Sequence, residues 1–586
     1  MRLINTRTGL FEEFIGRNIP PYAILSHTWD DEEVSFQDMT SNPSCMSMKG
    51  FQKIQATCQM ACDADLTYAW VDTCCIDKTS SAELTEAINS MYLWYQRSKV
   101  CYVYLADMDP SSDIKTSLPN CCWFTRGWTL QELIAPDNVV FFDQEWNRRG
   151  EKRNLLQELF LITGIGEKVL DHTQPLSSMS VAQKMSWAAH RATTRIEDIA
   201  YSLLGIFGVN MPLMYGEEDK AFRRLQEEIM RTTPDLSLFA WRLPPPDDAI
   251  YADTQKRPSK RVYCGFLADS PLAFSQAGSL AKRPFGSRRE FAFSNCGIKT
   301  QVQTWSYTKP KLGKRSYLLP LDCSWDPDLP LGVLIKKCGP DQFLREDPWN
   351  LVECRGLVSP NPPLQRYLLT DLSEMTMDPN KQLLDSSRFL SHVRPHVLQL
   401  EGSGSIDTYE VWSRARWDDE DFVFFVAANP SHDSSFMTLG VRLQVNKWGV
   451  SLPEHVTFKV ICFVVGWASP SEPGPQITLL DYKKHPMMDE VLARIKLWDP
   501  DTHQLWTQLR LRGIPRSPEA VFAIPETDLF ARVYYTLELV TDPEICARKF
   551  WKLHIASEVC SKKDLKPVSD QHWTFDRVKH GWKNVP

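Results

Sequence analysis

The first 150 residues alternate short apolar runs of strand length with longer stretches of helical periodicity. The apolar runs cover residues 22–26, 68–72, 100–105 and 139–142, and helical patterns cover residues 49–63 and the segment that starts at Ser80. Strands that alternate with helices predict a parallel sheet covered by helices on both faces. We therefore expect an α/β domain over residues 1–150.

The rest of the chain changes character twice. Residues 151–242 have helical periodicity, in particular at 181–190, 197–207 and 219–231, which predicts a helical extension. The Pro-rich tract at 242–248 is typical of a linker. Residues 243–586 contain β-like runs separated by Pro, Gly, Asp and Ser, which predict a β-rich domain, a sandwich or a barrel. At 586 residues the chain is too long for one core.

Composition excludes several function classes. The net charge is only -7 and no long basic run occurs, which argues against nucleic acid or an anionic membrane as partner. No apolar run is long enough to cross a bilayer, and the start lacks the apolar segment of a signal peptide. We therefore expect a soluble, cytoplasmic protein with reduced cysteines.

The motifs of several common enzyme classes are missing from the sequence. There is no P-loop, no GxGxxG, no HExxH and no GxSxG. The adjacent pairs Cys74-Cys75 and Cys121-Cys122 cannot easily bind one tetrahedral metal, and no CxxC occurs. We expect neither a metal site nor a bound cofactor.

Polar and aromatic residues follow three of the predicted strands. The first group is Ser26-His27-Thr28-Trp29, the second runs from Asp72 through Cys75 to Asp77, and the third runs from Arg126 through Trp128 to Glu132. Ligands of parallel sheets bind at the carboxyl ends of the strands. Three such loops at one sheet edge favour a pocket, although each could also hold only its own hydrogen bonds.

Glu132 has two opposed interpretations. The run Thr129-x-x-Glu132 fits a capping box, in which Thr and Glu bond the free N–H groups at a helix start. Trp128 would then be a buried packing residue, and Leu130, Leu133 and Ile134 core contacts. Alternatively, Glu132 faces a cleft and acts on a ligand. The local pattern leaves both open.

Four segments of this region resemble the fungal heterokaryon incompatibility (HET) domain. They are Tyr-Ala-Ile-Leu-Ser-His-Thr-Trp at 22–29, Trp-Val-Asp-Thr-Cys-Cys-Ile-Asp at 70–77, Glu-Ala-Ile-Asn-Ser-Met at 86–91 and Arg-Gly-Trp-Thr-Leu-Gln-Glu-Leu at 126–133. Their order and spacing match over about residues 20–150, and residues 195–222 resemble the region that follows the domain in such proteins. Among the departures, Asp30 and Glu218 stand where the family usually has Gly. The resemblance implies non-self recognition and programmed cell death in a filamentous fungus.

The HET domain is in turn similar to Toll/interleukin-receptor (TIR) domains. Plant TIR domains have a Trp-Cys-Leu-x-Glu-Leu run whose glutamate cleaves NAD, and residues 128–133 match it except at Thr129. By this resemblance the N-terminal domain is TIR-like, Glu132 is the catalytic carboxylate and NAD is the substrate rather than a cofactor. TIR-type sites are often completed across subunits, so self-association is implied as well.

Breaking the nicotinamide–ribose bond passes through an oxocarbenium-like state, which a carboxylate stabilises. In this hypothesis Trp29 and Trp128 stack on the bases, Ser26, His27 and Arg126 contact phosphate or ribose, and Asp72 and Asp77 bind ribose. Asp72 could equally hold its own loop, His27 could be a core histidine, and Cys75 is a packing residue more than a nucleophile.

Two rival hypotheses stay open. The domain could signal by self-association without catalysis, or bind a nucleotide without hydrolysing it. Under each hypothesis we expect the β-rich region to be a sensor or an inhibitory cover, and a protein partner could supply the activating signal.

Overall fold

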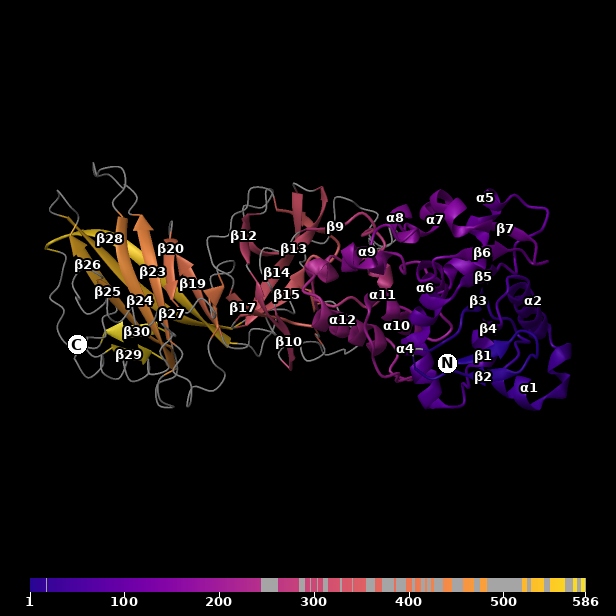
Figure 1. The fold of residues 1–586 in the computed structure, drawn as a ribbon. Helices are drawn as coiled ribbons and strands as arrows, with labels where there is room; N and C mark the ends of the chain where they lie inside the picture. The colour runs from indigo at the N-terminus through magenta and orange to yellow at the C-terminus, as the bar shows by residue number, and fades with distance from the viewer. Residues whose placement is uncertain are drawn as a thin grey trace.

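The structure is a computed structural model. It describes residues 1–16 and 18–243, residues 262–354 with short gaps, and beyond these mainly β-strands with a few neighbouring residues. The N-terminal sheet lies at one end, and helices separate it from the β-rich part (Figure 1).

The N-terminal domain is built on a seven-stranded sheet in the order β2-β1-β4-β3-β5-β6-β7. The strands are β1 (Arg2–Asn5), β2 (Phe11–Glu13), β3 (Tyr22–His27), β4 (Tyr68–Trp70), β5 (Val100–Tyr104), β6 (Val139–Phe142) and β7 (Arg148–Glu151). The four predicted strands are present and parallel to one another.

The sheet as a whole is mixed, which corrects the expectation of a purely parallel one. Strands β1, β2 and β7 pair antiparallel at its two edges. Short connections, such as residues 143–147 between β6 and β7, permit only antiparallel pairing. These edge strands have few consecutive apolar residues, so the sequence pattern did not reveal them.

The helices follow the predicted pattern closely. Helix α2 (Lys49–Asp63) has the predicted bounds. Helix α4 (Ser81–Arg97) begins after Ser80, whose side chain accepts a hydrogen bond from the Glu83 N–H. Its buried residues recur at helical spacing and face the sheet: Ala87, Ile88, Met91 and Tyr95. The shorter helical elements of this part are α1 (Phe36–Ser41), α3 (Asp72–Cys75), α5 (Ile114–Ser117), η3 (Cys122–Thr125) and α6 (Thr129–Ile134).

The connections reverse direction between β3 and β5. The chain runs from β3 through α2 to β4 on one side, then returns through α4 to β5 on the other side of β3. Helix α2 contacts β3 and β4, whereas α4 and α6 contact each other and α6 contacts β3. Such a reversal opens a crevice at the carboxyl ends of the two strands, where ligands of open α/β sheets bind.

A helical segment follows the sheet and packs on the side of α4 and α6 (Figure 1). Its helices are α7 (Leu156–Thr163), α8 (Glu167–Leu170), α9 (Val181–Ser186), α10 (Asp198–Tyr201), α11 (Leu204–Phe207) and α12 (Lys220–Thr232). A Cβ on Gly205 of α11 would lie 2.0 Å from the Cβ of Tyr92. Only glycine permits this close approach of α11 to α4.

The β-rich part begins at β8 (Val262–Cys264) and contains an eleven-stranded sheet whose longest strands are β13 (Arg315–Asp326) and β14 (Leu329–Gly339). Arg345 of β15 (Gln342–Glu346) joins it to the helical segment by donating to the carbonyls of Phe239 and Trp241. Most of the predicted linker lies outside the described residues, and the predicted domain boundaries stay predictions. One cluster of buried apolar residues includes both Leu3 of the N-terminal domain and Leu368 of the β-rich part.

The remaining strands of the eleven-stranded sheet are β9 (Ala281–Lys282), β10 (Phe291–Ser294), β11 (Gly297–Val302), β12 (Trp305–Thr308), β16 (Val352–Glu353), β17 (Leu364–Leu368) and β18 (Leu384–Asp385). Strands from β19 (Val397–Gly402) to β30 (Gly581–Asn584) form further sheets of six, four and two strands. The described C-terminal residues are thus β-rich. None of the described helices has the length and apolar character needed to cross a membrane.

Candidate functional site

Glu132 packs against the end of β3 and against β5. It belongs to α6, all six residues of which are buried, and its side chain points back to the end of β3. The Sγ of Cys101 on β5 contacts the Glu132 carbonyl at 4.0 Å. Only 6% of Glu132 is exposed, so the carboxylate does not reach the surface in this conformation.

The capping interpretation of Glu132 is wrong. The residue that precedes α6 is Trp128, and no side chain caps the helix. The Thr129 hydroxyl instead contacts the carbonyls of Trp123 and Arg126 at 2.5 and 3.0 Å. The Glu132 carboxylate is therefore free of the helix start and is used elsewhere.

Ser26 is the direct partner of Glu132. Its hydroxyl donates to Oε2 of Glu132 over 2.5 Å and accepts from the indole Nε1 of Trp123 over 2.8 Å. All three side chains are buried. Because the indole can only donate, it leaves the Ser26 proton directed at the carboxylate.

The electrostatic surroundings favour the neutral form of Glu132. Burial raises the pKa of Glu132 to about 8, and the nearby Asp72 carboxylate adds to the rise. The hydroxyls of Ser26 and Tyr95 and the charge of Arg126 act in the opposite direction. A carboxyl whose pKa lies near neutrality can exchange a proton at physiological pH, as the acids and bases of active sites do.

His27 and Asp72 flank this pair at the ends of β3 and β4. The His27 Nδ1 lies 3.9 Å from Oδ1 of Asp72, and its Nε2 lies 3.5 Å from Oε2 of Glu33. Within the described part of the chain, Oδ1 of Asp72 and both ring nitrogens of His27 are buried without a hydrogen bond. Buried polar groups of this kind are costly and occur at sites that bind ligands or perform chemistry.

Trp29 covers the outer side of Asp72. Its indole Nε1 donates to Oδ2 of Asp72 over 2.9 Å, and the Lys78 ammonium lies 3.6 Å from its ring centroid. The indole is 46% exposed, although Lys78 occupies one of its faces. Burial lowers the pKa of Lys78, and the charge of Asp72 opposes this effect.

The loop after β3 is held by a buried ion pair. Lys53 of α2 donates to Glu33 over 2.5 Å and to Asp30 over 2.7 Å. Burial alone would raise the pKa of Glu33, but the nearby His27 and Lys53 bring it down to about 2. Asp30, which departs from the usual Gly of the family, thus gives Lys53 a second carboxylate.

Three predicted site residues lie apart from Glu132. Cys75 is buried with its sulfur at the Val71 N–H. Asp77 accepts hydrogen bonds from Thr79 and Gln37 and closes its own turn, which lowers its pKa. Trp128 is half-buried and hydrogen-bonds Asp198 of the helical segment.

Arg126 is the one predicted cation near Glu132. It is half-buried, and its charge lowers the pKa of Glu132. The backbone around it pairs with the helical segment: the Gly127 N–H donates to the Ala192 carbonyl over 2.9 Å, and the Ala192 N–H donates to the Thr125 carbonyl over 2.7 Å. A Cβ at Gly127 would lie 2.5 Å from Cγ2 of Thr193, so the Gly of this motif permits the contact.

Sequence reasoning missed several residues around Glu132. Tyr95, whose hydroxyl donates to the Leu25 carbonyl, was recognisable only as an apolar-face residue of α4. Trp123 and Arg191 lie outside the predicted strand ends, and nothing in their neighbours along the chain marks them. Among the described residues, no group of three or more His, Cys, Asp and Glu side chains is placed to hold a metal.

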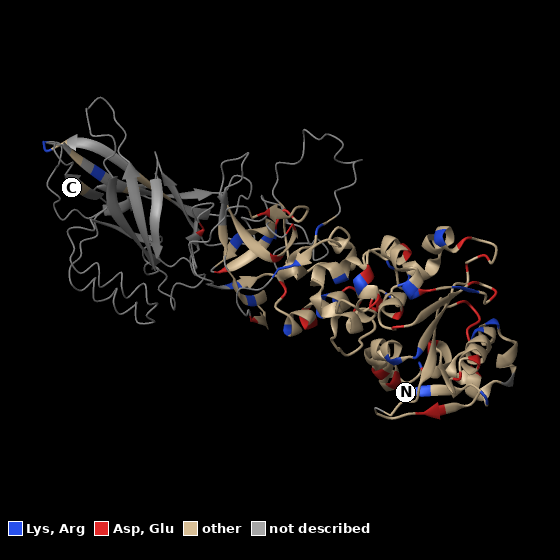
Figure 2. Cartoon of the chain, turned by 45° about the horizontal axis from the view of Figure 1, so that its top comes forward, with Lys and Arg blue, Asp and Glu red and all other residues tan. Residues whose placement is uncertain are grey.

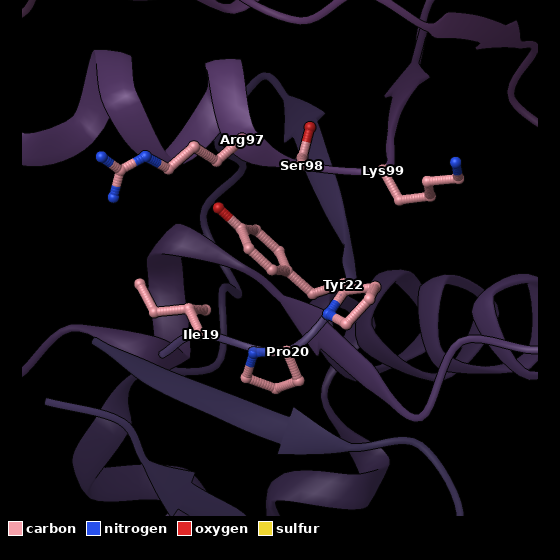
Figure 3. Close-up of a pocket in the computed structure, with 7 residues that line it drawn as sticks. Ile19, Pro20, Tyr22, Arg97, Ser98 and Lys99 are labelled. Carbon is pink, nitrogen blue, oxygen red and sulfur yellow. The ribbon is translucent and has the colours of Figure 1, made fainter. Parts of the chain in front are cut away.

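A separate pocket lies at the opposite end of the central strands (Figure 3). It has a volume of about 370 Å³ and is lined by residues around the start of β3 and the junction of α4 and β5, including Ile19, Pro20, Tyr22, Arg97 and Lys99. Tyr22 is drawn between the other labelled residues (Figure 3). Because these residues lie around the starts of β3 and β5, the pocket is at the amino ends of these strands and is not part of the Glu132 site.

Charges of both signs are interspersed along the described N-terminal part (Figure 2). The candidate site therefore owes its electrostatic character to a few buried groups, above all Glu132, Asp72 and the Glu33–Lys53 pair.

Comparisons with known proteins match two parts of the chain to family models. Residues 22–120 match the heterokaryon incompatibility protein (HET) family, and residues 220–316 match a domain of unknown function (DUF8212). The chain is 49% identical over 221 residues to the vegetative incompatibility protein HET-E-1 of Podospora anserina. This match covers 36% of the chain but only 16% of that protein, so most of the relative has no counterpart in it. No solved structure matches the chain.

Proposed function

We propose that this chain, which carries a heterokaryon incompatibility domain over residues 22–120, is an effector of fungal non-self recognition and programmed cell death. The relative from Podospora anserina is named a vegetative incompatibility protein, and it shares almost half of the aligned residues with this chain. We further propose that the domain cleaves NAD at the nicotinamide–ribose bond with Glu132. The substrate is suggested by the resemblance of residues 128–133 to the TIR motif.

The contact between Ser26 and Glu132 carries the catalytic proposal. A helix-start glutamate with a structural role would bond the backbone of its own helix, whereas this one is held by Ser26 at the end of β3. The nicotinamide nitrogen is already cationic and leaves without a general acid. The ionised carboxylate then has one task, to stabilise the positive charge that develops on the ribose.

Ser26 and Arg126 support this task by favouring the ionised form of Glu132. Asp72 and His27 have buried polar atoms that make no hydrogen bond, and these are suited to ribose hydroxyls. Trp29 offers an exposed ring to a base. Cys75 and Asp77 have structural roles, and we do not assign them to the substrate. Trp128 lies on the far side, against Asp198.

The burial of Glu132 favours a second candidate, a signalling module without catalysis. At 6% exposure the carboxylate cannot meet NAD unless the loops at the crevice open. In the catalytic proposal, self-association or a protein partner opens them. In the rival proposal Glu132 only holds Ser26 and α6 in place.

Nicotinamide release separates these candidates. Purified wild type and Glu132→Gln are incubated with NAD, both dilute and after concentration to force assembly, and nicotinamide is measured by chromatography. Glu86→Gln, an exposed glutamate of α4, is the control. Release that Glu132→Gln abolishes and Glu86→Gln retains supports the enzyme. No release by wild type in either state rejects it, and calorimetry with NAD and ADP-ribose then distinguishes nucleotide binding from pure self-association.

A further inference from the structure

We propose that Arg191, supplied by the helical segment, is a positioning residue that fixes the first turn of α6 and thereby the Glu132 carboxylate. This inference rests on the proposed function of Glu132. It means that the candidate site depends on a residue about 70 positions beyond the matched family segment, which ends at residue 120.

Arg191 bonds the start of α6 directly. Its Nη1 donates to the Arg126 carbonyl over 2.8 Å and to the Thr129 hydroxyl over 2.9 Å. Its Nε donates to the Trp187 carbonyl over 3.2 Å, which holds the side chain to its own segment. The arginine is buried, so water does not compete for these bonds.

Hydrogen bonds of Thr129, Trp123 and Ser26 connect Arg191 to the Glu132 carboxylate. The Thr129 hydroxyl that accepts from Arg191 lies 2.5 Å from the Trp123 carbonyl. The Trp123 indole donates to Ser26, and Ser26 donates to Glu132. Thr129 and Glu132 lie in the same turn of α6. Arg191 therefore holds this turn at Thr129, and Ser26 holds it at Glu132.

The neighbours of Arg191 reinforce this contact through the backbone. Ala192 makes two backbone hydrogen bonds, with Thr125 and Gly127, on either side of the bridge to Arg126. Cγ2 of Thr193 lies 2.5 Å from the place that a Cβ at Gly127 would occupy. The segment from Trp187 to Thr193 therefore forms a strap across the loop that leads into α6.

The position of Arg191 is unfavourable for helix stability alone. A cation beside the first turn of a helix faces the positive end of the helix dipole. Burial lowers the pKa of Arg191 to about 9, and the charge of Glu132 opposes this effect. The buried Arg191 therefore does not stabilise the helix dipole of α6. Its position is better explained by a role in ordering the Glu132 carboxylate and the nearby carbonyls.

Arg345 provides a matched control. It is also a fully buried arginine that donates to two carbonyls, those of Phe239 and Trp241, but it joins the helical segment to the β-rich part. Both Arg191→Met and Arg345→Met remove a buried guanidinium and leave carbonyls unpaired. If Arg191 has only a structural role, the loss of kcat should be similar in the two variants.

The test measures kcat and KM for NAD together with hydrogen exchange of the peptides that cover residues 123–134. For Arg191→Met we expect kcat to fall about tenfold or more, since small misplacements of a catalytic group are costly, with KM unchanged and faster exchange in these peptides. Arg191→Lys, which keeps a buried donor, should restore much of kcat. Arg345→Met should leave kcat and this exchange as in wild type.

Three outcomes would overturn the proposal. The first is an equal loss of kcat in Arg191→Met and Arg345→Met. The second is a raised KM with unchanged kcat in Arg191→Met. The third is wild-type exchange over residues 123–134 in Arg191→Met. The exchange result is independent of NAD cleavage, so an inactive wild type would reject the proposed function while exchange still decides whether Arg191 orders α6.

Discussion

The Ser26 hydroxyl lies 2.5 Å from Oε2 of Glu132 and joins the end of β3 to the first turn of α6. Trp123 donates to the same hydroxyl, so one serine oxygen connects a strand, a helix and a buried indole. The bond favours the ionised carboxylate against burial, which by itself favours the neutral acid. The balance between these two effects makes the behaviour of Glu132 testable.

Ser26→Ala should raise the pKa of Glu132 further and destabilise the fold. The variant removes a donor to the carboxylate and leaves the Trp123 indole without its acceptor, at a cost of about 1–3 kcal/mol. Denaturant unfolding at pH 7 measures this loss. Any release of nicotinamide should shift to higher pH in the variant. Unchanged stability would mean that the Ser26 hydroxyl is not a buried bridge.

The stability of wild type relative to Glu132→Gln should fall as pH rises. The pKa of Glu132 is about 8 in the folded protein and near 4.5 when unfolded, so between these values the folded state retains a proton that the unfolded state has lost. The contribution of Glu132 is therefore complete below about pH 4.5 and is lost as pH rises toward 8. The slope is at most about 1.4 kcal/mol per pH unit. A difference that does not vary from pH 5 to pH 9 would contradict the raised pKa.

Gly127→Ala should destabilise the contact between α6 and the helical segment. The new Cβ would lie 2.5 Å from Cγ2 of Thr193. Overpacking of this kind costs about 1–3 kcal/mol. Thr193→Ser removes Cγ2 and keeps the hydroxyl that donates to the Arg195 carbonyl. In a double-mutant cycle of unfolding free energies, the serine should recover much of the loss; additive effects would place Thr193 elsewhere.

Glu218→Gly should stabilise the protein by about 0.5–1 kcal/mol. Glu218 has a φ of 52°, in the left-handed region that costs most residues about 1 kcal/mol or more and glycine nothing. Its side chain is exposed, so little else is lost. Glu228→Gly, inside α12, should instead lower stability by roughly 1 kcal/mol. Thermal unfolding compares the two, and a melting temperature that falls for both would contradict the prediction.

Local pattern was sufficient for the elements that bury a regular face. The helix at residues 49–63 and the capped helix after Ser80 were predicted correctly, because apolar residues recur there every three or four positions. The four parallel strands were predicted because each is a short, continuous apolar run. The edge strands β1, β2 and β7 were missed because half-exposed strands of three or four residues contain too few apolar positions to make a pattern.

The candidate site was only partly predictable. Parallel strands end at one edge, so the proximity of Ser26 and Asp72 to the α6 loop followed from topology. The capping pattern at Thr129 misled because the chain is already helical at Trp128, which leaves Thr129 inside the helix. Arg191 could not be predicted, since it reaches α6 through a tertiary contact that spans 65 residues to Arg126.

The most direct test of the catalytic proposal is kcat/KM for nicotinamide release from NAD, measured from pH 6 to pH 9 for wild type and Glu132→Gln. For the free enzyme, kcat/KM should rise with pH to a midpoint near the Glu132 pKa of about 8, because only the ionised carboxylate stabilises the ribosyl cation. Glu132→Gln should release no nicotinamide at any pH. Equal release by the two proteins, or none by wild type in its assembled form, would contradict the proposal.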